Sequence, residues 1–212
     1  MSELDGIYVL KHNSIKIVKE KIIYIDPFQI DIPIHDADLI LCTHSHYDHF
    51  SPTDIKAVAN EKTAIITTED CKSEVEKIGF IEENIYYAKP YEEFEYEDIK
   101  ISTVPAYNKH KDFHPKSKNW VGYILDIDGV KYYIAGDTDD NKEARKVECT
   151  VAFLPVGGTY TMNYIEAANL ATKIWPKYVI PTHYGSIVGN PEDGYLFKEL
   201  IDEEDIKCEI YM

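Results

Sequence analysis

Three histidines and one aspartate fall within six consecutive residues of this chain, and this cluster constrains the fold more than any other feature. His44, His46, Asp48 and His49 follow an apolar segment, residues 37–42, that is typical of a buried strand. Residues two apart in an extended chain point to the same side, so the imidazoles of His44 and His46 can converge on one ion. Asp48 and His49 occupy the turn before an expected helix. Imidazole and carboxylate groups in this arrangement indicate a site for divalent metal ions.

The alternative interpretation of the cluster is a polar surface loop that happens to be rich in histidine. The chain contains eight histidines, and three of them lie in this loop, which favours the metal site. Two more residues of the ligand type follow later expected strands. Asp137 comes after Gly136, which allows a tight exit from the strand, and His183 follows the expected strand at 178–180. An ordinary helix cap is the alternative role for Asp137, and a buried structural histidine is the alternative for His183.

Short apolar strands alternate with amphipathic helices along the whole chain. Strands are expected at residues 7–10, 14–18, 22–25, 37–42, 64–67, 85–88, 91–96, 99–104, 121–126, 130–135, 151–154, 178–180 and 208–211. Helices are expected at residues 51–60, 69–78, 163–174 and 191–202. Asp128 and Gly129 predict a tight hairpin between two of these strands. The pattern predicts an α/β (α+β) fold in which two sheets have helices on their outer faces, within one domain spanning residues 1–212.

Composition sets the class of protein around the cluster. Apolar residues make up 44% of the 212 residues, which suits one globular domain with a large core. No segment has the run of about 20 apolar residues that a membrane span requires, and the acidic first residues lack the pattern of a signal peptide. We therefore expect a cytoplasmic protein without a membrane span. The four cysteines are widely separated, which favours free thiols over a disulfide.

The charge distribution narrows the choice of partner. Formal net charge is −16, so the surface as a whole repels nucleic acid, and we expect no nucleic-acid partner. Residues 108–119 are an exception, because they carry one aspartate and four lysines, Lys109, Lys111, Lys116 and Lys118. This basic loop is a candidate landing place for an anion, and a small-molecule substrate is the expected partner. A solvated loop that merely contains lysines is the alternative.

The layout of these residues resembles the metallo-β-lactamase superfamily. The shared features are H-x-H-x-D-H at residues 44–49, Gly-Asp-Thr at 136–138 and Thr-His at 182–183. The opening segments, residues 11–17 and 24–28, look like the branch that contains the L-ascorbate-6-phosphate lactonase, the phospholipase D acting on N-acylphosphatidylethanolamine and the UPF0173-like metal-dependent hydrolases. The resemblance covers nearly the whole chain. It implies a four-layer αβ/βα sandwich with a metal centre at one edge of the sheets.

Carried over position by position, the resemblance implies a centre for two divalent metal ions. The implied ligands are His44 and His46 for the first ion, Asp48, His49 and His183 for the second, and Asp137 as a bridge between them. Zinc is the default for such an imidazole-rich set, and manganese, iron and nickel accept the same ligands. Asp48 would also be the catalytic residue, because its carboxylate would orient the attacking water or accept its proton.

One ligand of the family pattern is displaced in this sequence. The family usually has a third histidine on the first ion, shortly after a strand, and the corresponding position here holds Asn108. His114 is the preferred candidate for the missing ligand, His110 is the second and Asn108 itself is the third. His12 is expected to be structural or to support a ligand. Asp26 either hydrogen-bonds a ligand histidine or closes the turn after its strand.

The predicted activity is hydrolysis by a metal-bound hydroxide, because two divalent ions that share a water lower the pKa of that water towards neutrality. The expected substrate is a small anionic ester, lactone or phosphodiester. A covalent nucleophile is not indicated, since the chain lacks a G-x-S-x-G elbow. The alternatives are an iron-bound redox or oxygen-handling protein and a non-catalytic metal-binding domain. Self-association into a homo-oligomer is compatible with the sequence.

Overall fold

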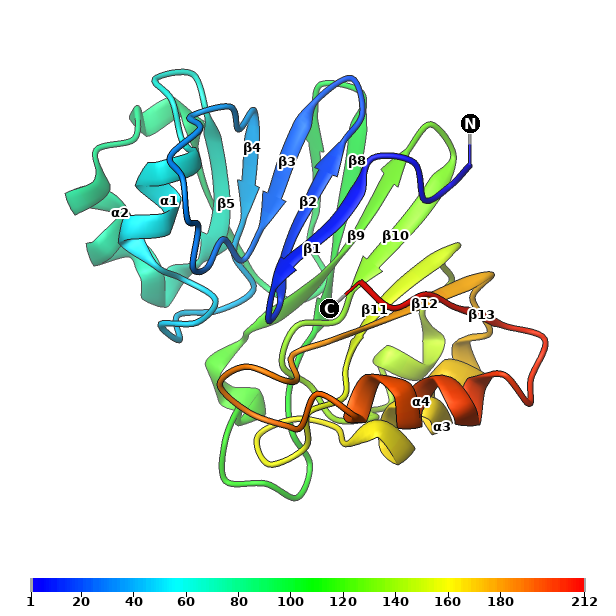
Figure 1. The fold of residues 1–212 in the computed structure, drawn as a ribbon. Coiled ribbons are helices and arrows are strands. Elements are labelled where there is room, and N and C mark those ends of the chain that lie inside the picture. Colours follow the sequence, from blue (N-terminus) through cyan, green and yellow to red (C-terminus); the bar gives the residue numbers. More distant parts are fainter. Residues whose placement is uncertain (1, 212) are drawn as a thin grey trace. The chain divides into compact units, whose positions relative to one another are not determined.

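The computed structural model describes residues 2–211, which divide into two compact units. The first unit ends at Ala88 and the second begins at Lys89. Each unit consists of one mixed β-sheet and two α-helices. In Figure 1 the first unit runs from blue to blue-green and the second from green to red. The predicted α/β class with two sheets is confirmed.

The sheet of the first unit contains six strands in the order β1-β2-β3-β4-β5-β6. Their bounds are β1 (Ile7–Lys11), β2 (Ser14–Val18), β3 (Ile22–Ile25), β4 (Leu39–Leu41), β5 (Ala64–Thr68) and β6 (Ile85–Ala88). The first three strands form an antiparallel meander, whereas β3 to β6 run parallel. Every residue of β4 and β5 is buried, as expected for parallel strands in the interior of a fold.

Two helices, α1 (Pro52–Val58) and α2 (Lys72–Ile78), pack against this sheet and lie beside β4 and β5 in Figure 1. A 3-10 turn, η1 (Glu69–Cys71), precedes α2, and a second, η2 (Glu82–Asn84), precedes β6. Apolar side chains from the helices and from the parallel strands share one buried core, which includes Ile40, Ile55, Val58, Ile65 and Val75. Burial of these side chains supplies most of the stability of a unit like this.

The topology of the first unit places its functional residues at one edge. β3 and β4 are parallel neighbours, and Ile25 pairs with Leu41, so both strands end together. Asp26 directly follows β3, and the histidine cluster directly follows β4. Helix α1 begins immediately after the cluster, where the hydroxyl of Ser51 accepts a hydrogen bond from the amide of Asp54 at 3.3 Å. The carboxyl ends of parallel strands are where α/β sheets carry functional loops.

The sheet of the second unit contains seven strands in the order β13-β12-β11-β10-β9-β8-β7. Their bounds are β7 (Glu93–Tyr96), β8 (Ile99–Pro105), β9 (Val121–Ile127), β10 (Val130–Ile134), β11 (Val151–Pro155), β12 (Tyr178–Thr182) and β13 (Lys207–Cys208). β7 to β10 are antiparallel, and β10 to β13 are parallel. The predicted hairpin between β9 and β10 is confirmed, since Ile127 pairs with Val130 and both Asp128 and Gly129 have positive φ.

The helices of the second unit, α3 (Tyr164–Ile174) and α4 (Asp193–Ile201), pack on its parallel strands. Asn163 and Glu166 form a capping box at the start of α3. Two 3-10 turns, η3 (Lys116–Lys118) and η4 (Ala144–Lys146), lie in the loops after β8 and β10. The buried core joins helices and strands through Leu154, Leu170, Ala171, Val179 and Phe197. The loops that follow β8, β10 and β12 carry the candidate ligands of this unit.

The observed elements differ from the predicted ones mainly at their ends. The last strand was expected at 208–211 but covers only 207 and 208, because its pairing with β12 ends at a hydrogen bond from the amide of Glu209 to the carbonyl of Val179. The helix expected at 51–60 ends at Val58, since Ala59 is extended with ψ of 147°. Among residues 2–211, no helix is long and apolar enough to cross a membrane.

Candidate metal centre

His44 and His46 come together in the loop after β4. The imidazole Nε2 of His44 lies 3.0 Å from the Nδ1 of His46, and the ring centroids are 4.7 Å apart. The convergence expected from the sequence is present, but its cause differs, because this segment is bent rather than extended. The carbonyl of His46 accepts hydrogen bonds from the amides of His49 and Phe50, at 2.9 and 2.7 Å. The bend at residues 43–46 and the tight turn that follows it bring the two rings together.

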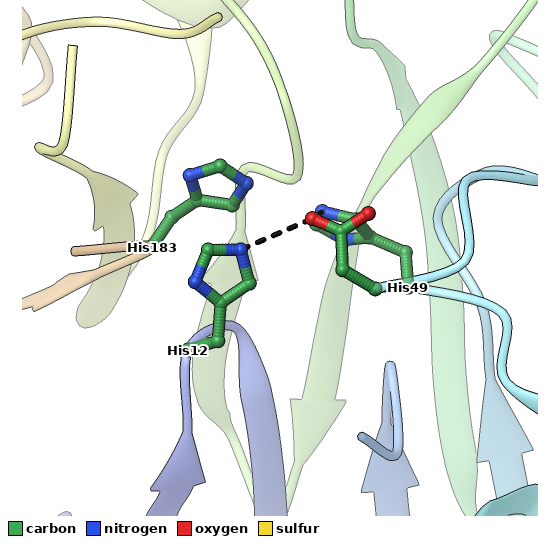
Figure 2. Close-up of side chains that lie close together, drawn as sticks. His12, His49 and His183 are labelled. Atoms are coloured by element: carbon green, nitrogen blue, oxygen red, sulfur yellow. Dashed lines mark hydrogen bonds and ion pairs between the residues drawn. The ribbon is translucent and has the colours of Figure 1, made fainter. Parts of the chain in front are cut away.

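Asp48 stands between two imidazoles of the first unit. Its Oδ2 lies 3.5 Å from the Nε2 of His49 and 3.1 Å from the Nε2 of His12, which is fully buried. Figure 2 shows the imidazoles of His12 and His49, with a dashed line for the hydrogen bond between His12 and the Asp48 carboxylate. Sequence reasoning did not connect His12 with Asp48. The available signal was a polar residue in the short turn between β1 and β2, where Lys11 pairs with Ser14.

The buried carboxylate of Asp26 orients the histidine cluster through hydrogen bonds. Asp26 is fully buried, and its Oδ2 accepts a hydrogen bond from the Nδ1 of His49 at 2.7 Å. It also accepts from the amide and the hydroxyl of Thr43, at 2.7 and 2.8 Å, and from the amide nitrogen of Asn13 at 2.7 Å. Asp26 thus takes the first of its two alternative roles, since it hydrogen-bonds a histidine of the cluster. Such partners hold a ring at the angle that a ligand requires.

These hydrogen bonds determine which nitrogen of each ring carries the proton. A carboxylate only accepts, so the Nδ1 of His49 must donate to Asp26, which leaves a lone pair on its Nε2. The hydroxyl of Thr43 donates to Asp26, so its oxygen accepts from the Nδ1 of His44 at 3.0 Å. The Nε2 of His44 therefore also keeps a lone pair. In the neutral form each imidazole can therefore bind a metal ion through Nε2.

The second unit contributes one carboxylate and two imidazoles. Asp137 follows β10, His183 follows β12, and His114 lies in the loop after β8; all three are buried. The Oδ2 of Asp137 lies 3.0 Å from the Nε2 of His114, and its Oδ1 lies 3.2 Å from the Nε2 of His183. One carboxylate oxygen thus faces each ring. This is the geometry of a carboxylate that can bridge two neighbouring ions.

The loop after β8 places the three candidates for the displaced histidine position differently. The side-chain amide of Asn108 donates to the carbonyls of Phe113 at 2.9 Å and Tyr160 at 2.6 Å, and its backbone amide donates to the carbonyl of His114 at 2.9 Å. The Nδ1 of His114 lies 3.1 Å from the carbonyl of Tyr160 and donates to it, which leaves the lone pair on Nε2 beside Asp137. His110 is exposed. Asn108 therefore closes the loop, and His114 presents the ring nitrogen.

Four of the residues described above have a left-handed backbone, which side chains with a Cβ atom rarely adopt. The φ angles are +56° for His12, +46° for Asp26, +56° for His114 and +58° for His183. Each such conformation costs on the order of 1 kcal/mol or more in a residue other than glycine. His12, Asp26 and His183 each directly follow a strand, and His114 lies within the loop after β8. Hydrogen bonds hold the side chains of His12, Asp26 and His114 in the directions that this backbone gives them.

Carboxylates from other segments of the chain neutralise much of the positive charge of the basic loop. Lys111 forms an ion pair with Asp139 and lies 3.4 Å from Glu166. Lys116 lies 2.9 Å from Glu143, whose carboxylate also accepts from the hydroxyls of Tyr91 and Tyr107. Lys118 lies over the ring of Trp120, with its Nζ 5.7 Å from the centroid. Much of the positive charge counted in the sequence is therefore already engaged within the second unit.

The hydrogen-bond network around Glu143 lowers the pKa of its carboxyl group. Burial alone would raise the pKa of the Glu143 carboxyl, but the hydrogen bonds from Lys116, Tyr107 and Tyr91 outweigh burial and lower that pKa to about 2. The carboxylate therefore stays ionised throughout the neutral range. It ties the loop after β8 to the loop after β10, which are the segments that carry His114 and Asp137.

The four cysteines do not supply a nucleophile. Burial raises the pKa of the Cys71 thiol to about 11 and the pKa values of Cys149 and Cys208 to about 12. Burial also raises the pKa of the Cys42 thiol well above its ordinary value. All four are free thiols. Because the thiolate is the reactive form, these side chains are inert at neutral pH.

The residues present fit divalent metal ions. In the first unit the ligand atoms of His12, Asp48 and His49 lie within 4.8 Å of one another, as do those of His44 and His46. In the second unit, those of His114 and Asp137 meet the same limit. Imidazole nitrogens with lone pairs and carboxylate oxygens are the donors that zinc and similar ions take.

Comparison with known proteins identifies the family. A profile of the beta-lactamase superfamily domain matches residues 6–183, a range that includes every candidate ligand. The chain is 34% identical over 218 aligned positions to a UPF0173 metal-dependent hydrolase of Pyrococcus furiosus, with 92% of this chain and 91% of that protein covered. A UPF0173 metal-dependent hydrolase of Thermococcus onnurineus is 33% identical over 217 positions, with the same coverage.

Solved structures agree with the sequence relatives. A crystal structure of a metal-dependent hydrolase from Parabacteroides distasonis is 33% identical with a TM-score of 0.81, and the match covers 96% of this chain and 91% of that one. The metallo hydrolase Igni18 from Ignicoccus hospitalis has a TM-score of 0.78 over 96% of this chain and 93% of its own, and at 22% identity it shows the fold alone. The chain therefore belongs to the metallo-β-lactamase superfamily, and it is a metal-dependent hydrolase.

Proposed function

We propose that this chain is a two-metal hydrolase whose ligands come from both units. The proposed ligands are His44, His46 and His114 for the first ion, Asp48, His49 and His183 for the second, and Asp137 as the bridge. The observation that carries the proposal is the Asp137 carboxylate, which presents one oxygen to His114 and the other to His183. The fixed Nε2 lone pairs of His44 and His49 support it from the first unit.

The proposal requires the two units to act as the single domain expected from the sequence. The matched range, residues 6–183, runs through both units without interruption. The UPF0173 relatives are also matched over nine-tenths of their length.

Bound divalent ions supply a nucleophile at neutral pH and polarise the oxygen under attack. The residues of the chain provide the rest. Asp48 is the proposed catalytic residue: its carboxylate accepts a hydrogen bond from the Nε2 of His12, which fixes its orientation. Asp26 holds the imidazole of His49, and Asn108 together with the carbonyl of Tyr160 holds that of His114. No step requires a covalent intermediate with the protein.

The proposed substrate is a small molecule with an ester, lactone or phosphodiester bond, and the lysines of the basic loop support an anionic one. Lys109 is the lysine of this loop that adjoins Asn108, and its side chain is exposed. Its backbone amide donates to Asp139 at 2.8 Å, which anchors the chain and leaves the side chain directed outward. Zinc is the proposed ion. Cytoplasmic location, self-association and the absence of a nucleic-acid partner stay predictions.

Metal analysis of matched variants tests the proposal. His46→Ala should lose metal from the first position and His183→Ala from the second, so each should retain about one ion where the parent protein retains about two. Hydrolysis of p-nitrophenyl acetate and of bis(p-nitrophenyl) phosphate should fall by about a hundredfold or more in both variants. His110→Ala is the control, because this exposed histidine lies in the same loop as His114. Full metal content and activity in His46→Ala would exclude the proposed centre.

A further inference from the structure

Exposed aromatic side chains adjoin the proposed ligands in both units. Tyr47 stands in the chain between His46 and Asp48, and it is 66% exposed. Phe113 directly precedes His114 and is 48% exposed. Large apolar side chains are normally covered, and isolated exposed ones are common on any surface. Two exposed rings, each bonded directly to a ligand residue, are a feature of the site rather than of the general surface.

Each exposed ring rests on a second ring. In the first unit Tyr47 meets Phe28 edge to face, with centroids 6.1 Å apart and planes at 70°. Phe28 is buried, and its centroid is also 6.1 Å from the ring of His12, which hydrogen-bonds Asp48. Edge-to-face packing of this kind holds a ring in a fixed orientation. The ring of Tyr47 is therefore supported by Phe28, which also packs against His12, the residue that hydrogen-bonds Asp48.

The second unit repeats this arrangement with different residues. Phe113 meets Tyr160 edge to face, with centroids 4.6 Å apart and planes at 76°. The carbonyl of Tyr160 accepts from the Nδ1 of His114, and the carbonyl of Phe113 accepts from the side-chain amide of Asn108. The backbone that fixes the His114 ring thus also fixes both aromatic rings. The loop therefore presents an apolar surface in the residue next to His114.

The lysines near Phe113 do not explain why the aromatic rings are exposed. Lys111 and Lys116, the basic-loop residues on either side of Phe113, are paired with Asp139 and Glu143. Their ion pairs engage much of the charge that would attract an anion, whereas the two rings remain open to solvent. An apolar group of a substrate gains free energy from covering such rings, at about 25 cal/mol for each Å² removed from water.

We propose that Tyr47, backed by Phe28 in the first unit, binds an apolar alkyl or aryl group of a substrate beside Asp48. Phe113, backed by Tyr160 in the second unit, binds such a group beside His114. This inference rests on the proposed function and deepens it, because it names the class of ester: one with an apolar acyl part. Tyr47 and Phe113 are specificity-determining residues in this reaction. The basic loop then contributes to binding of a charged part of the same molecule only through its exposed lysines.

A homologous series of probes tests the inference. The probes are p-nitrophenyl acetate, butanoate and hexanoate with the zinc-loaded protein, and the measured quantity is the ratio of kcat/KM for hexanoate to that for acetate. A fully buried methylene contributes about 0.8 kcal/mol, which corresponds to about fourfold per methylene. Partial burial on an open platform should give roughly twofold per methylene, so the ratio should exceed about tenfold. In Tyr47→Ala and Phe113→Ala this ratio should fall to within about threefold of unity.

Matched variants separate recognition from general damage to the fold. Tyr47→Phe and Phe113→Leu keep an apolar surface and should keep the ratio of the parent protein. Tyr8→Ala on β1 and Tyr195→Ala on α4 remove exposed aromatic rings, 51% and 59% exposed, that do not adjoin a ligand, and they should also keep it. Binding of acetate, butanoate and hexanoate anions, followed by calorimetry, gives a readout that does not depend on turnover and should show the same chain-length trend.

The outcomes distinguish the two proposals. A parent ratio near unity, or a ratio unchanged in Tyr47→Ala and Phe113→Ala, would overturn the role of the aromatic pairs while hydrolysis itself still supports the proposed function. Chain-length-dependent binding of the carboxylate anions that is lost in the alanine variants would support the aromatic pairs even if no ester were hydrolysed. In that case only the ester form of the proposed function would be rejected.

Discussion

The two units position their proposed ligands by different structural means. In the first unit His44, His46, Asp48 and His49 come from one loop between a strand and a helix, and a single buried carboxylate, Asp26, orients it. In the second unit His114, Asp137 and His183 come from three loops far apart in sequence. There the orienting contacts are made by backbone carbonyls and by one side-chain amide. The first half of the centre is compact in sequence, and the second is assembled by the tertiary fold.

This difference predicts how each half responds to damage. Asp26 serves four hydrogen-bond donors at once, so its loss should disturb the whole cluster and the stability of the unit. The orienting groups of the second unit are the side-chain amide of Asn108 and the carbonyl of Tyr160, so a change there should affect a single ligand. Substitutions of the orienting residues, rather than of the ligands, are therefore the sharpest tests of the comparison.

The largest effect is expected for Asp26→Ala. It leaves the buried Nδ1 of His49, the amide and hydroxyl of Thr43 and the amide of Asn13 without their acceptor, which should cost about 3–5 kcal/mol of unfolding free energy. Urea unfolding in the presence of a chelator measures this without a contribution from metal. Glu74→Ala on α2 is the control, since that carboxylate pairs with Lys77 on the surface of the same unit and should cost below about 1 kcal/mol. Equal losses would show that Asp26 does not organise the first unit.

A smaller and more local effect is expected for Asn108→Ala. Removal of the amide that closes the loop should weaken metal binding by about 10–100-fold, the usual consequence of losing a residue that orients a ligand. Competition with a chromogenic chelator gives this number. Asn13→Ala is the counterpart in the first unit and should lose less than about tenfold, because three donors would still hold Asp26. If Asn13→Ala proved the more damaging of the two, the contrast between the units would be wrong.

The smallest effect is expected from Glu143, and it depends on pH. The pKa of its carboxyl is lowered from 4.5 in the ordinary state to about 2 in the folded protein. The ionised form therefore stabilises the fold above pH 4.5, and this contribution is lost as pH falls from 4.5 to 2. The difference in Tm between the parent protein and Glu143→Gln should shrink across that window. Glu93→Gln, on the edge strand β7, is the control, and a difference that persisted at pH 2 would contradict the assignment.

The contrast between the units also explains what the sequence could predict. The proposed ligands of the first unit follow one strand within six residues, so their pattern can be recognised from the sequence alone. Asp137 and His183 could be proposed because each follows a recognisable strand. His114 could only be ranked above His110 and Asn108, since the choice depends on how a loop closes on itself. Hydrogen bonds to the carbonyls of Phe113 and Tyr160 decide that closure, and neither leaves a mark in composition or periodicity.

The strands and helices could be predicted because, like the histidine cluster, they depend on residues that are close together in the sequence. Apolar periodicity and turn residues act over a few positions, and they fixed the positions of β2, β3, β6 and the hairpin between β9 and β10. Long-range pairings could not be predicted. His12 meets Asp48 across 36 positions, and Lys111 reaches Glu166 across 55. The net charge of the basic loop was therefore a poor guide to its electrostatics, because its counter-charges come from elsewhere in the chain.

The left-handed backbone at His12, Asp26, His114 and His183 has a consequence for the evolution of the protein. Glycine adopts this conformation without steric cost, so at these positions a change to glycine would relieve strain while removing the side chain. Selection for heat resistance alone would therefore favour glycine at His12, His114 or His183 wherever the strain outweighs the contacts of the side chain. It would not do so at Asp26, whose four hydrogen bonds contribute more than the strain costs. A thermostable lineage of this protein obtained without selection for turnover would thus tend to lose proposed ligands while keeping Asp26.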